Sequence, residues 1–207
     1  MHTGAVNHSG GKGWMAEGLQ EYSLVIQADN VVRQQVWLEQ QDLVLKYGLK
    51  GQSRAGHQIT IAKFAVRDGM EETLMRWIQR ICSNHRSFVI TLNNYSGHPP
   101  HTIYLRIQDQ WPIQQLIRQL RPVEDYIRSS ACPPPIMMMR PYLDIAGHLP
   151  QSVYEKAIPD FSRRSFHHSF LANDLLLVKS SPYEATNKTV NVFRFLPGTY
   201  ELYQELS

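Results

Sequence analysis

Short segments in which apolar residues alternate with polar ones, or stand together in runs, recur along the chain and predict β-strands. They cover residues 22–27, 58–64, 87–95, 101–108, 137–146, 166–180 and 188–196. The third and fourth segments are joined by a Gly- and Pro-containing turn, so we expect them to pair as neighbouring strands. The last two segments are expected to pair as well, and the length of the sixth suggests a bulge within it.

Between these segments, apolar residues recur three or four positions apart, as they do along one face of an α-helix. The predicted helices cover residues 30–47, 68–81, 112–120 and 150–161. The first has a possible cap in Asp29 or Asn30, and Gly48 stands where helices commonly end. Residues 122–136, which include three consecutive prolines, predict a long loop.

The order of elements repeats within the chain. From residue 58 the predicted order is strand, helix, strand, strand, and the same order returns from residue 140. When the two leading strands are aligned, Gln58 and Thr60 fall on Tyr142 and Asp144, and each pair points to one side of its strand. We therefore expect two lobes with approximate two-fold symmetry, whose leading strands face each other across a cleft.

Composition and charge fit a globular protein of one largish domain or two joined lobes. The chain has 207 residues, of which 43% are hydrophobic, and its net charge of +3 is compatible with an anionic partner. The sequence suggests neither a membrane span nor a secretory signal, and residues 1–18 are interpreted as a flexible leader. The two cysteines lack CxxC spacing, which favours free thiols and a cytoplasmic location.

The element order and several strand phrases resemble the 2H phosphoesterase superfamily, in particular its LigT-like 2′-5′ RNA ligases and cyclic phosphodiesterases. The phrases are QITIAKF at 58–64, HTIYLRI at 101–107, RPYLDIAGHLP at 140–150 and SFLANDLLLVKS at 169–180. The resemblance covers about residues 20–198. It implies an α+β, bilobal LigT-like fold, with two pseudo-symmetric lobes that each carry an antiparallel sheet and helices around a central cleft. One domain is then expected at 19–200, with repeats around 58–107 and 140–196 and a tail at 201–207.

The family carries a His-x-Thr or His-x-Ser motif in each lobe, and its two histidines move protons on either side of a phosphodiester without a metal. The resemblance places Gln58 and Thr60 at the first motif and Tyr142 and Asp144 at the second, so both histidines are replaced. Glutamine does not titrate, tyrosine with a pKa of about 10 is a poor base, and a carboxylate repels a phosphate unless it is protonated or bridged by a cation. The sequence therefore predicts that the family's hydrolysis of cyclic phosphodiesters is lost or severely reduced.

Other histidines are weaker candidates for this role. His57 precedes Gln58 and points to the opposite side of a regular strand, unless a bulge turns it round. His148 is expected in an exposed loop. His167 and His168 begin a strand, either as part of a basic rim or as ordinary solvated residues.

Two cationic residues flank the motif strands. Lys63 and Arg140 are candidates to hold a phosphate or a carboxylate, although Arg140 is alternatively a partner for a surface acid or for Asp144. Tyr142 is a candidate to stack on a nucleobase or, alternatively, to plug the cleft. Asp144 and His148 supply too few ligands for a metal site, so neither a metal nor another cofactor is expected.

These observations leave three hypotheses for the function. The first is a protein that lacks the two-histidine chemistry and binds a nucleotide, an RNA end or another small phosphorylated ligand in the cleft. The second is an active phosphoesterase in which Asp144 is the base and Tyr142 the acid or hydrogen-bond donor. The third is a protein-interaction module with a vestigial cleft. An open cationic cleft favours the first, a raised pKa of Asp144 the second, and a cleft closed by Tyr142 and an Arg140–Asp144 ion pair the third.

Overall fold

The computed structural model describes residues 18–49, 57–98, 101–180 and 187–198, so the expected tail and all of the expected leader except Gly18 lie outside it. The strands are β1 (Leu19–Gln27), β2 (Gln58–Arg67), β3 (Phe88–His98), β4 (Thr102–Ile107), β5 (Ile136–Met137), β6 (Tyr142–Ala146), β7 (His167–Ala172), β8 (Asp174–Ser180) and β9 (Lys188–Arg194). The helices are α1 (Asn30–Tyr47), α2 (Glu71–Cys82), α3 (Trp111–Gln119), α4 (Arg121–Ser129) and α5 (Gln151–Arg163), with a 3₁₀ turn at Asp68–Met70.

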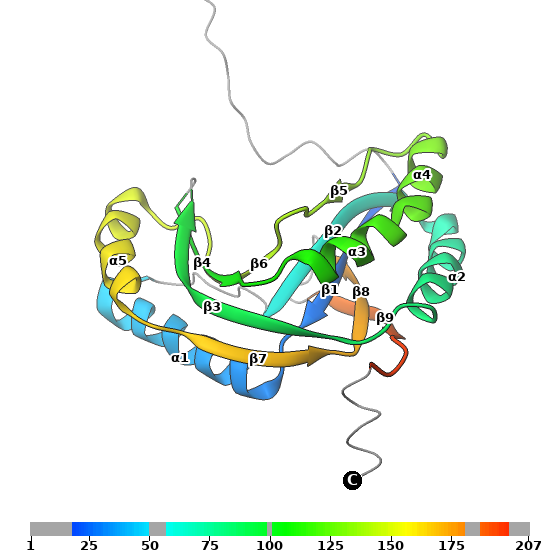
Figure 1. Ribbon diagram of the computed structural model, residues 1–207. Helices are drawn as coiled ribbons and strands as arrows, with labels where there is room; N and C mark the ends of the chain where they lie inside the picture. Colours follow the sequence, from blue (N-terminus) through cyan, green and yellow to red (C-terminus); the bar gives the residue numbers. More distant parts are fainter. Residues whose placement is uncertain (1–17, 50–56, 99–100, 181–186, 199–207) are drawn as a thin grey trace, which may run out of the picture.

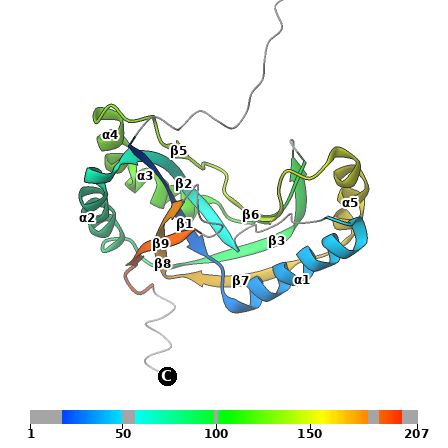
Figure 2. The same cartoon turned by 180° about the vertical axis from the view of Figure 1, so that it is seen from behind.

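The strands form one curled antiparallel sheet in the order β7-β3-β4-β6-β2-β1-β8-β9, and β5 pairs with β2. The sheet bends into a U, with α1 and α5 beside the arm that holds β3, β4 and β7, and α2, α3 and α4 beside the other arm (Figures 1 and 2). Each arm is an antiparallel sheet with its own helices, which confirms the bilobal α+β fold expected from the sequence. The strands of the predicted repeat are divided, since β2 lies in one arm and β3 and β4 in the other.

Helix α1 follows the sequence signals closely. The side chain of Asp29 accepts a hydrogen bond from the backbone N–H of Val32 at 2.8 Å, as an N-cap residue does. Gly48 ends the helix in the left-handed conformation, with φ at 65°, where a side chain is disfavoured. The apolar residues of the helix that face the sheet are buried in the main hydrophobic core.

Two predicted elements differ from the structure. Residues 121–129 form helix α4 rather than a loop, because Pro122 occupies the first turn, where its missing N–H is tolerated, and Val123 and Ile127 bury one face. The segment 166–180 is two strands rather than one bulged strand. Strand β7 pairs with β3, whereas β8 lies between β1 and β9, so the chain crosses from one arm to the other at Asn173.

The two cysteines are free and buried, as the sequence predicts. Burial raises the pKa of the Cys82 thiol to about 12, so this thiol stays protonated at neutral pH. In the described ranges, no helix has both the length and the apolar character needed to cross a membrane.

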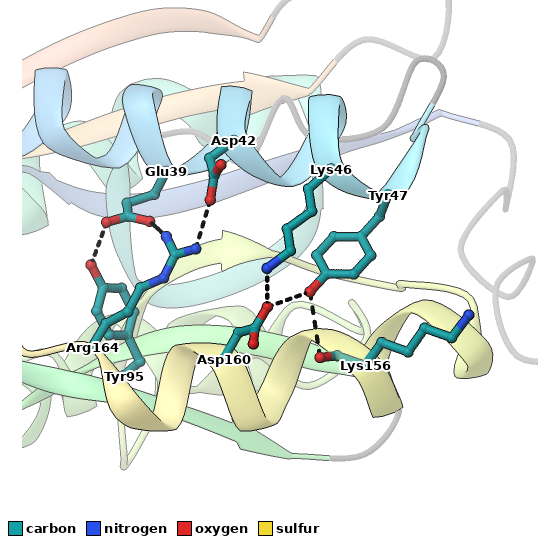
Figure 3. A network of polar contacts seen from close by, with 8 residues as sticks. All are labelled: Glu39, Asp42, Lys46, Tyr47, Tyr95, Lys156, Asp160 and Arg164. Atoms are coloured by element: carbon teal, nitrogen blue, oxygen red, sulfur yellow. Dashed lines mark hydrogen bonds and ion pairs between the residues drawn. The ribbon is translucent and has the colours of Figure 1, made fainter.

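A polar network holds α1 against α5 (Figure 3). The guanidinium of Arg164, the residue after α5, pairs with Glu39 and also with Asp42, at 2.6 Å from the Asp42 carboxylate. Elsewhere along the same two helices, Lys46 pairs with Asp160. Because α5 directly follows β6 in the chain, this network fixes the position of the element that leaves the second motif strand.

A buried hydrogen bond from a side chain of α1 also holds strand β6 in place. Tyr104 of β4 lies opposite Asp144 and Ile103 lies opposite Ala146, so Ile145 is the extra residue of a β-bulge. The backbone carbonyl of Ile145 accepts a hydrogen bond from the side-chain N–H of Gln40 at 3.1 Å, and Gln40 is only 5% exposed. A polar side chain inside the core thus supports the bulge next to Asp144.

We predict that Gln40→Leu lowers the free energy of unfolding by about 1–3 kcal/mol, because it removes a buried donor while keeping the side-chain volume. Urea denaturation measures this change. Gln41→Leu is the matched control, since Gln41 is exposed on the same helix, and its effect should stay within about 0.5 kcal/mol. Equal losses in both variants would show that the buried hydrogen bond is not the cause.

Candidate functional site

The two motif strands are direct neighbours in the sheet. Strands β2 and β6 pair antiparallel with Ile59 opposite Leu143, and both of these side chains are fully buried in the core. The sequence led us to expect that these two strands face each other across a cleft. The structure corrects this prediction, because the two strands are hydrogen-bonded neighbours in one sheet. The two arms curl around the β2–β6 pair, and this junction lies at the middle of the sheet.

This register brings the four motif positions together. With Ile59 opposite Leu143, the residue before Ile59 lies opposite Asp144 and the residue after it lies opposite Tyr142. Gln58, Thr60, Tyr142 and Asp144 therefore share the face of the sheet that turns away from the core, and all four are half-buried. We call this the inner face.

A β-bulge adds Lys63 to the same face. On β1, Val25 lies opposite Thr60 and Ser23 lies opposite Lys63, so Ile61 is the extra residue between them. Ser23 and Val25 are two residues apart on β1, so their side chains point to the same face of the sheet. Their partners Lys63 and Thr60 therefore share that face. Strict alternation along β2 would have placed Lys63 on the core side, but the bulge turns it to the inner face.

Three aromatic rings line the inner face of the other arm, and we call them the aromatic wall. The ring centroid of Tyr142 lies 4.6 Å from that of Tyr104 and 5.2 Å from that of His98. Burial raises the pKa of the Tyr142 hydroxyl, and the neighbouring Asp144 adds to this. Tyr142 thus leans on β3 and β4, and Arg106 is its neighbour on β4.

His98 and Arg106 were not among the residues predicted from the sequence. His98 stood in the segment expected to be a turn, but β3 extends to it and places it beside Tyr142. Arg106 is an exposed residue of β4 opposite Tyr142, which places it on the inner face. Neither carried a spacing signal, because only the pairing of β4 with β6 brings these residues to the motif strands.

Asp144 has surroundings that disfavour its charged form. Burial raises the pKa of its carboxyl, and the positive charges of Lys63, His98 and His148 lower it by less. Its Oδ1 atom is buried without a hydrogen-bond partner among the described residues. This carboxyl therefore holds a proton more readily than an ordinary aspartate, and when protonated it is a hydrogen-bond donor.

The remaining candidates lie outside this arrangement or at its rim. Arg140 is exposed ahead of β6. No ion pair between described residues joins Arg140 to Asp144, so the structure does not contain the pair that would close the cleft. The bulge in β2 occurs at Ile61 and not beside His57. His148 is exposed in the loop after β6, as expected. Within the described ranges, no three His, Cys, Asp or Glu side chains gather as metal ligands do.

A hollow with a volume of about 200 Å³ opens on the inner face beside the motif residues. Strands β1, β2, β5 and β8 supply its polar and apolar lining, which includes Glu21, Ser23, Lys63, Ala65, Ile136 and Ser180. Lys63 belongs both to this hollow and to the surroundings of Asp144. Lys63 therefore links the hollow to the motif site, although none of the four motif residues lines the hollow.

No protein-family model and no curated protein matches the sequence. Solved structures do match. Escherichia coli LigT in complex with 3′-AMP has a TM-score of 0.63 at 16% identity, and the match covers 86% of this chain and 98% of LigT. The apo form of LigT gives 0.60 at 14% identity, with the same coverage of both chains. The protein TT0787 of Thermus thermophilus gives 0.59 at 13% identity, covering 84% of this chain and 97% of that one.

Further structures show E. coli LigT in complex with NADP⁺ and with ATP. At these low sequence identities, the matches indicate a shared architecture, but they do not indicate the chemical role of any residue. The curled antiparallel sheet, the helices along its two arms and the nearly complete coverage of the matched chains agree with one another. The chain has a LigT-like fold.

Proposed function

We propose that this protein binds a small phosphate-bearing ligand of the nucleotide class on the inner face and lacks the two-histidine phosphodiesterase chemistry. The observation that carries this proposal is the convergence of Gln58, Thr60 and Lys63 with Tyr142 and Asp144 at the junction of the two arms. The pairing of β2 with β6 and the bulge in β2 produce that convergence.

The charges of the inner face suit an anion. Lys63 and Arg106 are exposed on it, and His98 stands beside Tyr142. Ammonium and guanidinium groups form charge-assisted hydrogen bonds with phosphate oxygens. The Thr60 hydroxyl and the Gln58 amide add neutral donors of the kind that complete a phosphate site.

The aromatic wall suits a nucleobase or a ribose. Base-to-ring stacking needs an open π-face and tolerates any base, and half-buried rings lose little side-chain entropy when they bind. Tyr142 and Tyr104 present such rings next to the cations. The complexes of E. coli LigT with 3′-AMP, NADP⁺ and ATP support a nucleotide-type ligand for a protein of this fold.

Asp144 fits this proposal in its protonated form. A carboxylate beside a phosphate would repel it, but a protonated carboxyl donates a hydrogen bond. The burial of Asp144 shifts its pKa in the required direction, and a bound anion would raise the pKa further. Phosphate binding and proton uptake at Asp144 are therefore coupled.

A second candidate function is acid–base catalysis by relocated groups. Two observations favour it: the raised pKa of Asp144, and the presence of His98 and His148 near enough to influence that carboxyl. The raised pKa of Tyr142 suits a donor rather than a base. The interaction-module hypothesis called for a cleft filled by Tyr142 and closed by an Arg140–Asp144 ion pair, and no such ion pair forms between the described residues.

We predict that the wild-type protein binds 3′-AMP in calorimetric titrations and that Lys63→Met weakens binding about tenfold or more, through loss of a charge-assisted hydrogen bond. Lys156→Met removes the same charge from the exposed surface of α5 and is the matched control, with unchanged affinity. The proposal fails if the wild type does not bind, or if both variants weaken binding equally.

The raised pKa of Asp144 predicts the pH dependence of stability. The folded state binds more protons than the unfolded state between the ordinary and the raised pKa, so stability falls as pH rises through that window. Asp144→Asn removes the titration, and it should be more stable than the wild type above the window, with no difference below it. Urea unfolding across a pH series measures this. If Asp144→Asn is less stable than the wild type at neutral pH, the charged carboxylate of Asp144 is stabilised by a partner, and the prediction is wrong.

Turnover of a 2′,3′-cyclic nucleotide separates the two candidate functions. Binding without catalysis predicts turnover at the level of the buffer blank. Relocated catalysis predicts measurable turnover that falls by about 10²–10⁴ in His98→Ala or Asp144→Asn, but not in the exposed control His167→Ala. Robust turnover that depends on Gln58 instead would overturn both candidates.

A further inference from the structure

The hollow beside Lys63 has a regular arrangement of side chains on the inner face. In one row across the sheet, Ile136 and Ser23 lie on either side of Lys63. One step further along β1, Glu21 lies between Ala65 and Ser180. These are direct cross-strand neighbours, whose side chains stand about 5 Å apart on the same face.

The lining of the hollow combines one strong acceptor with several donors. Glu21 is exposed, and it forms no hydrogen bond or ion pair with another described residue. Ser23, Ser180 and Lys63 line the same hollow and supply two hydroxyls and an ammonium. A carboxylate accepts from two adjacent N–H groups at once, while hydroxyls and an ammonium donate to a carbonyl oxygen.

We infer that this hollow is a base pocket selective for guanine, an inference that rests on the proposed binding of a nucleotide. The Watson–Crick edge of guanine presents two adjacent donors, N1–H and the N2 amino group, beside the O6 acceptor. Glu21 accepts hydrogen bonds from the two donors, and the hydroxyl of Ser23 or Ser180 donates a hydrogen bond to O6, while Lys63 stays with the phosphate. Adenine, cytosine and uracil each lack the pair of adjacent donors, and a carboxylate discriminates against them.

The size and position of the hollow fit a base whose phosphate lies at the motif residues. Glu21 is four residues from Val25, the neighbour of Thr60, which is about 13 Å along the strand. That span is comparable to the length of a nucleotide from its phosphate to the far edge of its base. Ile136 supplies an apolar wall on one side of the hollow for the face of the base.

The test is a calorimetric comparison of guanosine, inosine and adenosine 3′-monophosphates. Wild type should bind the guanosine nucleotide about tenfold or more tightly than the adenosine nucleotide, because a hydrogen bond to a charged group is strong. Inosine lacks the N2 amino group and should bind between the two. In Glu21→Gln the preference for guanosine should disappear, whereas the affinity for the adenosine nucleotide should be unchanged. Glu72→Gln, at an exposed acid on α2, is the control and should behave as wild type.

The outcomes separate this inference from the proposed function. If the three nucleotides bind alike and Glu21→Gln changes none of them, the guanine pocket is wrong and nucleotide binding stands. If none of the three binds, nucleotide binding itself is wrong. Glu21→Ala, tested in parallel, should also lose the preference. A retained preference in both folded variants, verified by circular dichroism, would assign the selectivity to another group.

Discussion

The structure depends on the pairing of β2 with β6, where Ile59 lies opposite Leu143. This pair joins the two arms of the sheet, and it decides which side chains share the inner face. The side-chain period of a strand is two, so a slip of one residue would send Asp144 into the core and Leu143 into water. Ile59 and Leu143 are fully buried, and their burial therefore fixes the strand register on which the site depends.

The short β6 strand does not hold this register alone. Gln40 of α1 supports the bulge at Ile145, and Arg164 at the end of α5 is paired with two acids of α1. Helix α1 thus contacts β6 directly and also the helix that follows it. The helices do more than cover the core, since they place the second motif strand against the first.

The inner face is not uniformly polar. Val25, Leu176 and Val178 form a small buried apolar cluster separate from the main core. Val25 lies opposite both Thr60 and Leu176, so the cluster is on the inner face next to the motif residues. Thr60 is consequently shielded from water on the side of β1. At Asp144, burial outweighs the nearby positive charges in setting the pKa.

Local signals in the sequence predicted much of the fold, and long-range pairing accounts for most of what they missed. The caps of α1 were predictable because a cap depends on neighbouring residues, as Asp29 and Gly48 show. The break at Asn173 was not, since an apolar run gives no sign that its two halves belong to opposite arms of the sheet. Lys63 was a candidate because it lies beside the motif in the sequence, but a bulge decides to which face of the sheet its side chain points. His98 had no local signal at all.

The side chains of the motif strands have a hydrogen-bonding chemistry of their own. Gln58 and Tyr142 offer hydrogen-bond donors, and Asp144 adds a carboxyl whose burial favours its protonated form. A site that donates hydrogen bonds and carries cations at its rim is suited to hold a phosphate. Proton transfer needs a group that both takes and gives a proton near neutral pH, and neither Gln58 nor Tyr142 meets that condition. In the proposed function, recognition therefore depends on the strand register, whereas proton transfer would depend on particular side chains that take and give a proton.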